Sequence, residues 1–131
     1  MSEEWRKIEG YKAYEVSNMG RVRSYWDRHG MGGRIMDTPQ RILTGNTGGK
    51  YKAVGLSQKT RGWRKQHLVH RLVLEAFVGP RPAGLEICHY DDDGHNNRLE
   101  NLRYDTPLAN AADAKRNRAA VIPNSTSAVE L

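Results

Sequence analysis

The chain has 131 residues and a mass of 14.9 kDa, which suits one domain or a small domain with an appendage. The net charge of +6, the pI near 9.7 and the mean hydropathy of −0.79 indicate nucleic acid as a partner more than an acidic protein. No apolar stretch approaches the roughly 20 residues that span a bilayer, no signal peptide is visible, and the single cysteine, Cys88, excludes an intrachain disulfide. We therefore expect a cytoplasmic protein with no membrane partner.

Charge is unevenly distributed along the chain. Residues 1–71 carry 15 of the 21 basic side chains and only 6 of the 15 acidic ones, a net charge of +9. Residues 72–131 carry the remaining 6 basic and 9 acidic side chains, a net charge of −3. We expect the basic half to bind a polyanion and the acidic half to have a different function.

The first predicted elements lie between Trp5 and Ser24. An apolar segment from Trp5 to Val16 leads to residues 17–20, whose composition is typical of a turn, and then to residues 21–24, which alternate polar and apolar. This pattern predicts a strand, a tight turn and a second strand. Residues 28–50 are rich in glycine and poor in apolar side chains, so we expect a linker that is mostly loop.

The second half of the chain predicts a hairpin, two helices and a short strand. Residues 51–57 and 63–70 alternate and are joined by a connection of hairpin length. From Arg71 to Phe77 the apolar residues take helical spacing. A brief apolar strand ends at His89, and Thr106-Pro107 is typical of the start of a helix that runs to about residue 118.

The stretch from Glu86 to Arg103 concentrates imidazoles, carboxylates and carboxamides where an ordinary domain would place one turn. Cleavage of a phosphodiester needs a base that activates water, a hard cation that offsets the developing charge, and ligands that hold both. Histidine, Asp or Asn, and Mg²⁺ meet these needs. His89 ends a predicted strand, and Asn101 and Asn110 follow it at separations of 12 and 21 residues.

In this arrangement the chain resembles the HNH (ββα-metal) endonucleases of phages and introns. The resemblance rests on His70-Arg71-Leu72-Val73 with Phe77, His89, the turn from Asp91 to Gly94, Asn96-Asn97, Asn101-Leu102 and Asn110. It covers residues 67–115 and is specific in combination. It implies an enzyme that hydrolyses DNA with the help of Mg²⁺ or Mn²⁺.

The resemblance also implies roles for individual residues. His89 matches the general base, a task that suits an imidazole that is neutral near pH 7. Asn101 matches the residue that fixes the loop after the catalytic histidine and orients the base. Asn110 matches a metal ligand that binds through its side-chain oxygen. His70 either lines the site and contacts the scissile phosphate or only caps the helix that follows the second hairpin strand.

The residue before the general base departs from the family pattern. Many relatives have an acidic metal ligand there, whereas this chain has Cys88, whose neutral thiol is a poor ligand for Mg²⁺. Either Asn110, water and DNA hold the cation, or a carboxylate from Asp91, Asp92 or Asp93 substitutes. Cys88 and Asp91 therefore join Asn110 as candidate metal-site residues.

A second resemblance covers the N-terminus. Residues 4–11 and 14–24 look like the nuclease-associated modular DNA-binding motif (NUMOD) that often precedes HNH domains. Arg21 and Arg23 alternate with Val22, which places both guanidinium groups on one face of a strand, where they could bind phosphates or base edges. The basic run further along the chain adds candidates. The candidate DNA-binding residues are Arg21, Arg23, Arg61, Arg64, Lys65 and Arg71.

We therefore expect a mixed α+β protein with a ββα-metal core. The expected divisions are 1–27 for the NUMOD-like motif, 28–50 for the linker, 51–118 for the HNH domain and 119–131 for a disordered tail. The expected function is hydrolysis of double-stranded DNA by a nicking or double-strand-cutting endonuclease of homing type, encoded by a phage or bacterium and acting as a monomer or homodimer. The alternative is a DNA-binding regulator that kept the HNH scaffold after losing its metal ligand.

Overall fold

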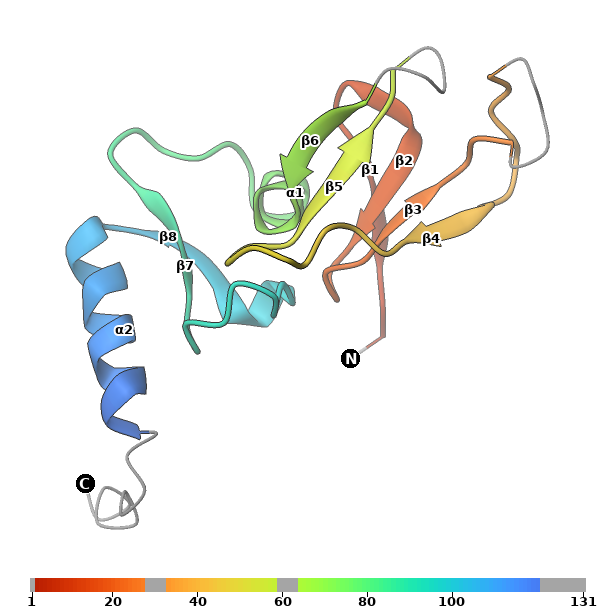
Figure 1. Cartoon of the computed structure of the whole chain (residues 1–131). Helices are drawn as coiled ribbons and strands as arrows, with labels where there is room; N and C mark the ends of the chain where they lie inside the picture. The colour runs from red at the N-terminus through yellow and green to blue at the C-terminus, as the bar shows by residue number, and fades with distance from the viewer. Residues whose placement is uncertain (1, 28–32, 59–63, 121–131) are drawn as a thin grey trace.

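The computed structural model describes residues 2–27, 33–58 and 64–120. Within these ranges the chain forms three small antiparallel sheets and two α-helices (Figure 1). The four-stranded sheet lies at one end of the molecule, helix α1 lies near the centre, and β7, β8 and α2 lie at the other end. The predicted α+β class is thus confirmed.

The first sheet has the strand order β1-β2-β3-β4, with β1 at Trp5–Ile8, β2 at Tyr11–Ser17, β3 at Val22–Ser24 and β4 at Arg41–Leu43. The prediction of a single strand before the turn was wrong, because the backbone reverses at Gly10, which takes the left-handed φ of 84° that glycine tolerates. The predicted linker also needs correction. β4 lies within it and pairs with β3, so this segment extends the sheet.

The second sheet pairs β5 at Ala53–Leu56 with β6 at Lys65–Leu68, which confirms the predicted hairpin. Helix α1 at Val69–Phe77 follows β6 directly and begins two residues before the predicted start. Its buried residues Val69, Leu72 and Val73 recur at the spacing of one helical face.

The third sheet and the last helix form the ββα unit. β7 at Glu86–His89 pairs with β8 at Leu102–Asp105, a 3₁₀ turn at Leu99–Asn101 precedes β8, and α2 at Pro107–Ala120 packs on β7. Thr106 caps α2 as predicted, because its Oγ1 accepts a hydrogen bond from the backbone N–H of Ala109 at 3.2 Å. The expected ββα core implies a second strand, but its position at β8 was not predicted, since its residues after Leu102 are all half-buried and show no alternation.

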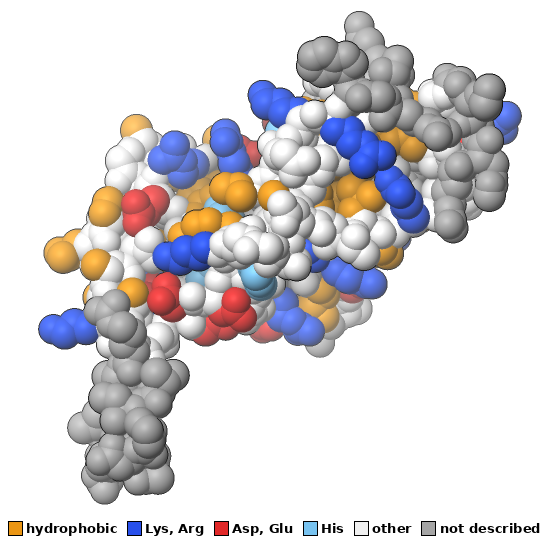
Figure 2. Space-filling view, viewed as in Figure 1, with side chains coloured by type: hydrophobic (Ala, Val, Ile, Leu, Met, Phe, Trp, Pro, Cys, Tyr) orange, Lys and Arg blue, Asp and Glu red, His pale blue; other side chains and the backbone are white. Residues whose placement is uncertain are grey.

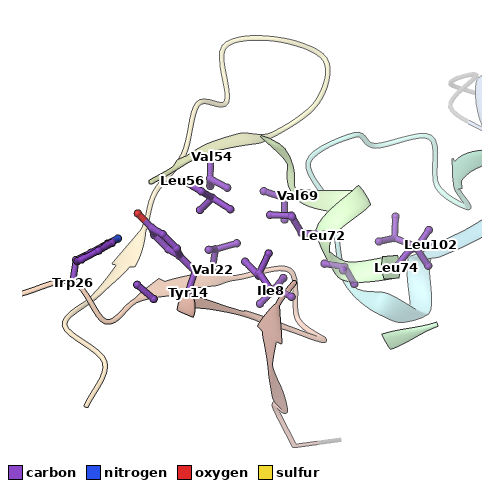
Figure 3. Packing of buried hydrophobic residues seen from close by; sticks show 13 residues of the cluster. Ile8, Tyr14, Val22, Trp26, Val54, Leu56, Val69, Leu72, Leu74 and Leu102 are labelled. Carbon is purple, nitrogen blue, oxygen red and sulfur yellow. The ribbon is translucent and has the colours of Figure 1, made fainter. Parts of the chain in front are cut away.

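One hydrophobic cluster joins the first sheet to the hairpin, α1 and the ββα unit. Figure 3 shows Val22 of the sheet near Leu56 of β5 and Val69 of α1, with Leu74 reaching towards Leu102 of β8. A fully buried aliphatic side chain contributes roughly 1.5–3 kcal/mol. The sheet, the hairpin and the ββα unit are therefore stabilised by shared packing, which fixes their mutual placement.

No helix in the described ranges is long and apolar enough to cross a membrane. Of the predicted tail, residues 119 and 120 belong to α2. The rest, from residue 121 onward, lies outside the described residues.

Candidate active site

His89 is the last residue of β7, and its side chain is only 5% exposed. Its Nε2 lies 3.0 Å from Oδ1 of Asn97, a buried residue of the loop that follows. The other ring nitrogen, Nδ1, has no hydrogen-bond partner among the described residues and is not fully enclosed. The imidazole is thus held at Nε2, while Nδ1 has no protein partner in the described part of the chain.

Two rings pack against the imidazole of His89. His70, in the first turn of α1, meets it edge-on with ring centroids 5.1 Å apart, and Tyr51 stacks on it at 5.8 Å. Burial, reinforced by the neighbouring His89, lowers the pKa of His70 to about 4, so its ring is neutral near pH 7. The structure therefore brings the two predicted histidines together. It also adds Tyr51, which follows the glycine-rich segment and carried no motif of its own.

The loop between β7 and the 3₁₀ turn, residues 90–98, is called the histidine loop below. Asn101 fastens it: Nδ2 donates to Oδ1 of Asp91 at 2.9 Å and to the carbonyl of Asn96 at 2.8 Å. Its Oδ1 accepts the N–H of Asp91 at 3.2 Å, and its backbone carbonyl accepts the N–H of Tyr90 at 2.9 Å. Asn101 therefore acts on the loop and not on the imidazole itself.

The residues before β5 support the other side of the histidine loop. Nε2 of His95 donates to the carbonyl of Gly49 at 2.8 Å. Gly94 lies so close to this segment that a Cβ there would overlap the carbonyl oxygen of Lys50. These contacts hold the histidine loop against the residues next to Tyr51.

The opposite face of β7 carries the candidate metal residues. Alternation along the strand puts Glu86 and Cys88 on one face and His89 on the other. Asn110, in the first turns of α2, donates from Nδ2 to Oε1 of Glu86 at 2.6 Å. Cys88 is fully buried, and burial raises the pKa of its thiol, which stays neutral and a poor ligand for a hard cation. Asn110 therefore has a carboxylate neighbour that the sequence did not single out.

Asp91, a predicted substitute ligand, is engaged within the histidine loop. Its Oδ2 accepts a hydrogen bond from Asn96 at 2.7 Å, and its Oδ1 accepts those from Asp93 and Asn101. Although burial opposes the change, these hydrogen bonds lower the pKa of Asp91. In the part of the chain that the structure describes, no group of three or more His, Cys, Asp or Glu side chains could hold a metal ion. The acidic residue that contacts Asn110 is Glu86, not Asp91.

A buried ion pair holds α2 against the sheet formed by β7 and β8. Arg103 of β8 lies 2.8 Å from both Asp105 and the buried Asp113, and Arg116 lies 2.9 Å from Asp113. The guanidinium of Arg103 also lies under the ring of Tyr90, 4.2 Å from its centroid. The pair fixes the position of α2 and thereby keeps its first turns against β7.

The predicted DNA-binding arginines of the first sheet have acidic partners. Arg21 donates to Glu3 at 2.9 Å, and Arg23 donates to Glu15 at 2.8 Å. Both guanidinium groups lie over the ring of Trp5, so they share a face, as the alternation predicted. The pKa of Glu3 falls to about 2, chiefly because of its hydrogen bond from Arg21, so this pair is fully charged near pH 7.

Other basic side chains have no ion pair within the described ranges. They include Arg64 and Lys65 of the hairpin and Arg41 of β4. Arg41 and Arg64 line two hollows. One, of about 460 Å³, lies between β4 and the hairpin, and the other, of about 260 Å³, lies against β2 and β3 and is also lined by Asp27. Figure 2 shows basic side chains along this side of the molecule and acidic ones around the histidines. Arg71 has an acidic partner one helical turn away, and Arg61 lies outside the described residues.

Two family models match the chain. An HNH endonuclease model matches residues 67–112, from β6 into α2, and the NUMOD4 motif matches residues 3–57, from β1 through β5. The NUMOD4 match thus extends beyond residues 1–27 and includes β4. These matches identify an HNH endonuclease domain with a NUMOD4 motif in front of it.

The chain is similar to the DNA endonuclease I-HmuI of Bacillus phage SP01, with 32% identity over 108 residues, which are 82% of this chain and 55% of that protein. It is also similar to YosQ, named as an SPbeta prophage HNH homing endonuclease of Bacillus subtilis strain 168, with 33% identity over 66 residues, 50% of this chain and 38% of that protein. A solved structure described as DNA binding and cleavage by the HNH homing endonuclease I-HmuI matches with a TM-score of 0.66 and 29% identity, over 96% of this chain and 65% of that chain.

This chain is therefore homologous to the homing endonuclease I-HmuI and to phage HNH endonucleases, and it carries the HNH domain and NUMOD4 motif that the sequence predicted. It spans only part of the length of these relatives: 55% of I-HmuI and 38% of YosQ in the sequence matches.

Proposed function

We propose that this chain hydrolyses phosphodiester bonds of double-stranded DNA in a metal-dependent reaction with His89 as the general base. The observation that carries the proposal is the imidazole of His89, which is hydrogen-bonded at Nε2 and has no protein partner at Nδ1 among the described residues. The HNH match and the relatives named as endonucleases support the same reaction. One such site in the described part of the chain favours nicking by a monomer, and double-strand cleavage would need two chains.

In this reaction water attacks phosphorus while its proton passes to Nδ1 of His89, and the bond from phosphorus to the 3′ oxygen breaks. Asn101 keeps the histidine loop, and with it the base, in place. The neutral ring of His70 and the ring of Tyr51 cover two sides of the imidazole, so proton transfer is directed to its open nitrogen.

Glu86 and Asn110 would hold the divalent cation. Their side-chain oxygens are hard donors, and Mg²⁺ or Mn²⁺ commonly keeps several waters and takes phosphate oxygens, so two protein donors fit it. When bound, the cation would neutralise charge on the phosphate and stabilise the leaving 3′ oxygen. Glu86 shares the face of β7 with Cys88, so it can supply the negative charge that the thiol does not.

Supercoiled plasmid should be nicked when Mg²⁺ or Mn²⁺ is present and stay intact in excess EDTA. Glu86→Gln should raise the Mg²⁺ concentration for half-maximal nicking by about tenfold or more, because it removes the charged donor beside Asn110. The measurement is the conversion of supercoiled to open-circular DNA on a gel across a metal titration.

Glu100→Gln is the matched control, because Glu100 is exposed and pairs with Arg98 at the surface. Equal metal requirements in the two variants would contradict the assignment of Glu86. Plasmid binding by the wild type without any nicking would instead support the second candidate, a DNA-binding regulator on a degenerate HNH scaffold. The observation that favours this candidate is the neutral, buried Cys88 in place of an acidic residue before the base.

We also propose that the duplex follows the hollows beside β4 and the hairpin of β5 and β6. Arg41 and Arg64 line these hollows and can bind phosphates there without first breaking an ion pair, and each contact releases counterions from the DNA. Arg21 and Arg23 would first have to leave their carboxylates. We therefore expect them to contribute less than their sequence pattern suggests.

Arg41→Ala and Arg64→Ala should each lower the slope of log affinity against log salt concentration by about 1. Arg21→Ala should change it less, because Glu3 already offsets the charge of Arg21. Fluorescence anisotropy of a labelled duplex at several salt concentrations measures the slope. A larger change for Arg21→Ala than for Arg41→Ala would move the duplex to the face that carries Trp5.

A further inference from the structure

The turn between β2 and β3, residues 17–20, contacts the segment that holds the base. The backbone N–H of Leu99 donates to the carbonyl of Asn18 at 2.8 Å. Gly20 lies against Asn97 so closely that a Cβ there would be 2.8 Å from both the carbonyl carbon and the oxygen of Asn97. The N-terminal motif therefore reaches the histidine loop at the residue that is hydrogen-bonded to the base.

This turn is held firmly by its own hydrogen bonds. Ser17 is fully buried, and its Oγ accepts hydrogen bonds from the N–H groups of Met19 at 3.2 Å and Arg21 at 3.1 Å. The N–H of Gly20 donates to the carbonyl of Ser17 at 3.0 Å. A side chain at Gly20 would meet backbone atoms and not a flexible tip, so either the turn or the histidine loop would have to move.

The contact of Asn97 with His89 bears on which ring nitrogen carries the proton. With Oδ1 of Asn97 facing Nε2, the hydrogen bond needs the proton on Nε2, because an amide oxygen only accepts. In the neutral ring Nδ1 is then unprotonated and can take a proton from water. Asn97 is only 3% exposed, and its Nδ2 has no partner among the described residues. The place of its side chain therefore depends on its backbone, against which the turn packs.

We propose that the β2–β3 turn of the N-terminal motif, acting through Asn97, positions the imidazole of His89. The proposal rests on the proposed function of His89 and extends it, because the motif then supports the chemistry as well as DNA binding. Asn97 and the turn act through the base, so they are positioning elements and not catalytic residues.

The first test reads the tautomer of His89 by ¹⁵N NMR of the full chain and does not need cleavage. The neutral ring of the wild type should be protonated at Nε2. Asn97→Leu keeps the size and removes the acceptor, so it should give mixed tautomers and lower kcat for nicking by about 100-fold at unchanged DNA affinity. Asn97→Asp keeps an acceptor oxygen and should keep the Nε2–H form.

A neutral wild-type ring protonated at Nδ1, or an unchanged tautomer in Asn97→Leu, would overturn the proposal. If the wild type shows the expected tautomer, and Asn97→Leu loses it, but the wild type nicks no DNA, the proposed function fails and the positioning of His89 by Asn97 stands. The two proposals can therefore fail separately.

The second test uses two glycines with the same backbone conformation. Gly10 and Gly20 have φ values of 84° and 82°, so alanine strains both turns similarly, but nothing lies within 4 Å of a Cβ at Gly10. Gly20→Ala should lower kcat by about tenfold or more and shift the ring resonances of His89. Gly10→Ala should do neither. Equal effects of the two variants, with thermal unfolding measured for both, would overturn the role of the turn. If Gly20→Ala does not fold, the Asn97 variants decide.

Discussion

Replacing His89 by alanine should lower kcat for plasmid nicking by about 10³-fold and leave the affinity for DNA nearly unchanged. General acid–base catalysis contributes roughly 10²- to 10⁴-fold to a rate. His70 cannot take over the proton, because its Nδ1 is buried and its pKa is lowered to about 4. His89 is almost fully buried, so its loss removes little surface that could touch DNA. Single-turnover nicking rates, with anisotropy in EDTA for the affinity, measure the two quantities.

His95→Ala is the matched control for this variant. His95 belongs to the same loop, but it is exposed and its ring bonds only to the carbonyl of Gly49. The variant His95→Ala should keep most of the nicking activity and all of the affinity for DNA. If both variants lose the same activity, or if His89→Ala fails by losing affinity for DNA, His89 is not the base. Thermal unfolding of both proteins shows whether a loss is one of structure.

The periodic elements could be predicted from the sequence, and the short ones could not. Helix α1 and the hairpin follow from apolar spacing, since their buried side chains recur along one face. β4 and β8 have three and four residues and show no alternation. They exist because β3 and β7 supply partners along the backbone, which is a tertiary effect that local pattern does not record.

For the candidate site, the sequence located the proposed base but not the groups that hold it. Asn97 could be read only as half of an Asn-Asn turn, because its contact with His89 depends on how an eight-residue stretch folds back. Glu86 could have been found: it stands two residues before Cys88 on a strand, hence on the same face. The ion pairs that occupy Arg21 and Arg23 join residues 18 and 8 positions apart in the sequence, so no local motif shows them.

Replacing Asn101 by alanine should lower both the stability of the protein and kcat. The side chain is buried and makes three hydrogen bonds to Asp91 and Asn96, so alanine leaves a backbone N–H, a carbonyl and a carboxylate without these partners. Asp91 is exposed and Asn96 half-buried, so water can replace part of these hydrogen bonds, and the loss of stability should be about 1 kcal/mol. Because the histidine loop then loosens around the base, kcat should fall by about 100-fold. Urea unfolding and single-turnover nicking measure the two losses.

Asn101→Asp separates the hydrogen bonds from the shape of the side chain. It keeps the size and an acceptor oxygen, but it sets a second carboxylate against Asp91, so near pH 7 it should be at least as unstable as Asn101→Ala. Protonation of the pair relieves the repulsion, so this variant should recover stability relative to the wild type as the pH falls towards 4, whereas Asn101→Ala should not. A stable Asn101→Ala with reduced kcat would contradict the fastening role. His89→Ala should lower kcat and change the stability little, whereas Asn101→Ala should lower both. This contrast distinguishes the residue that takes the proton from the residue that holds the histidine loop.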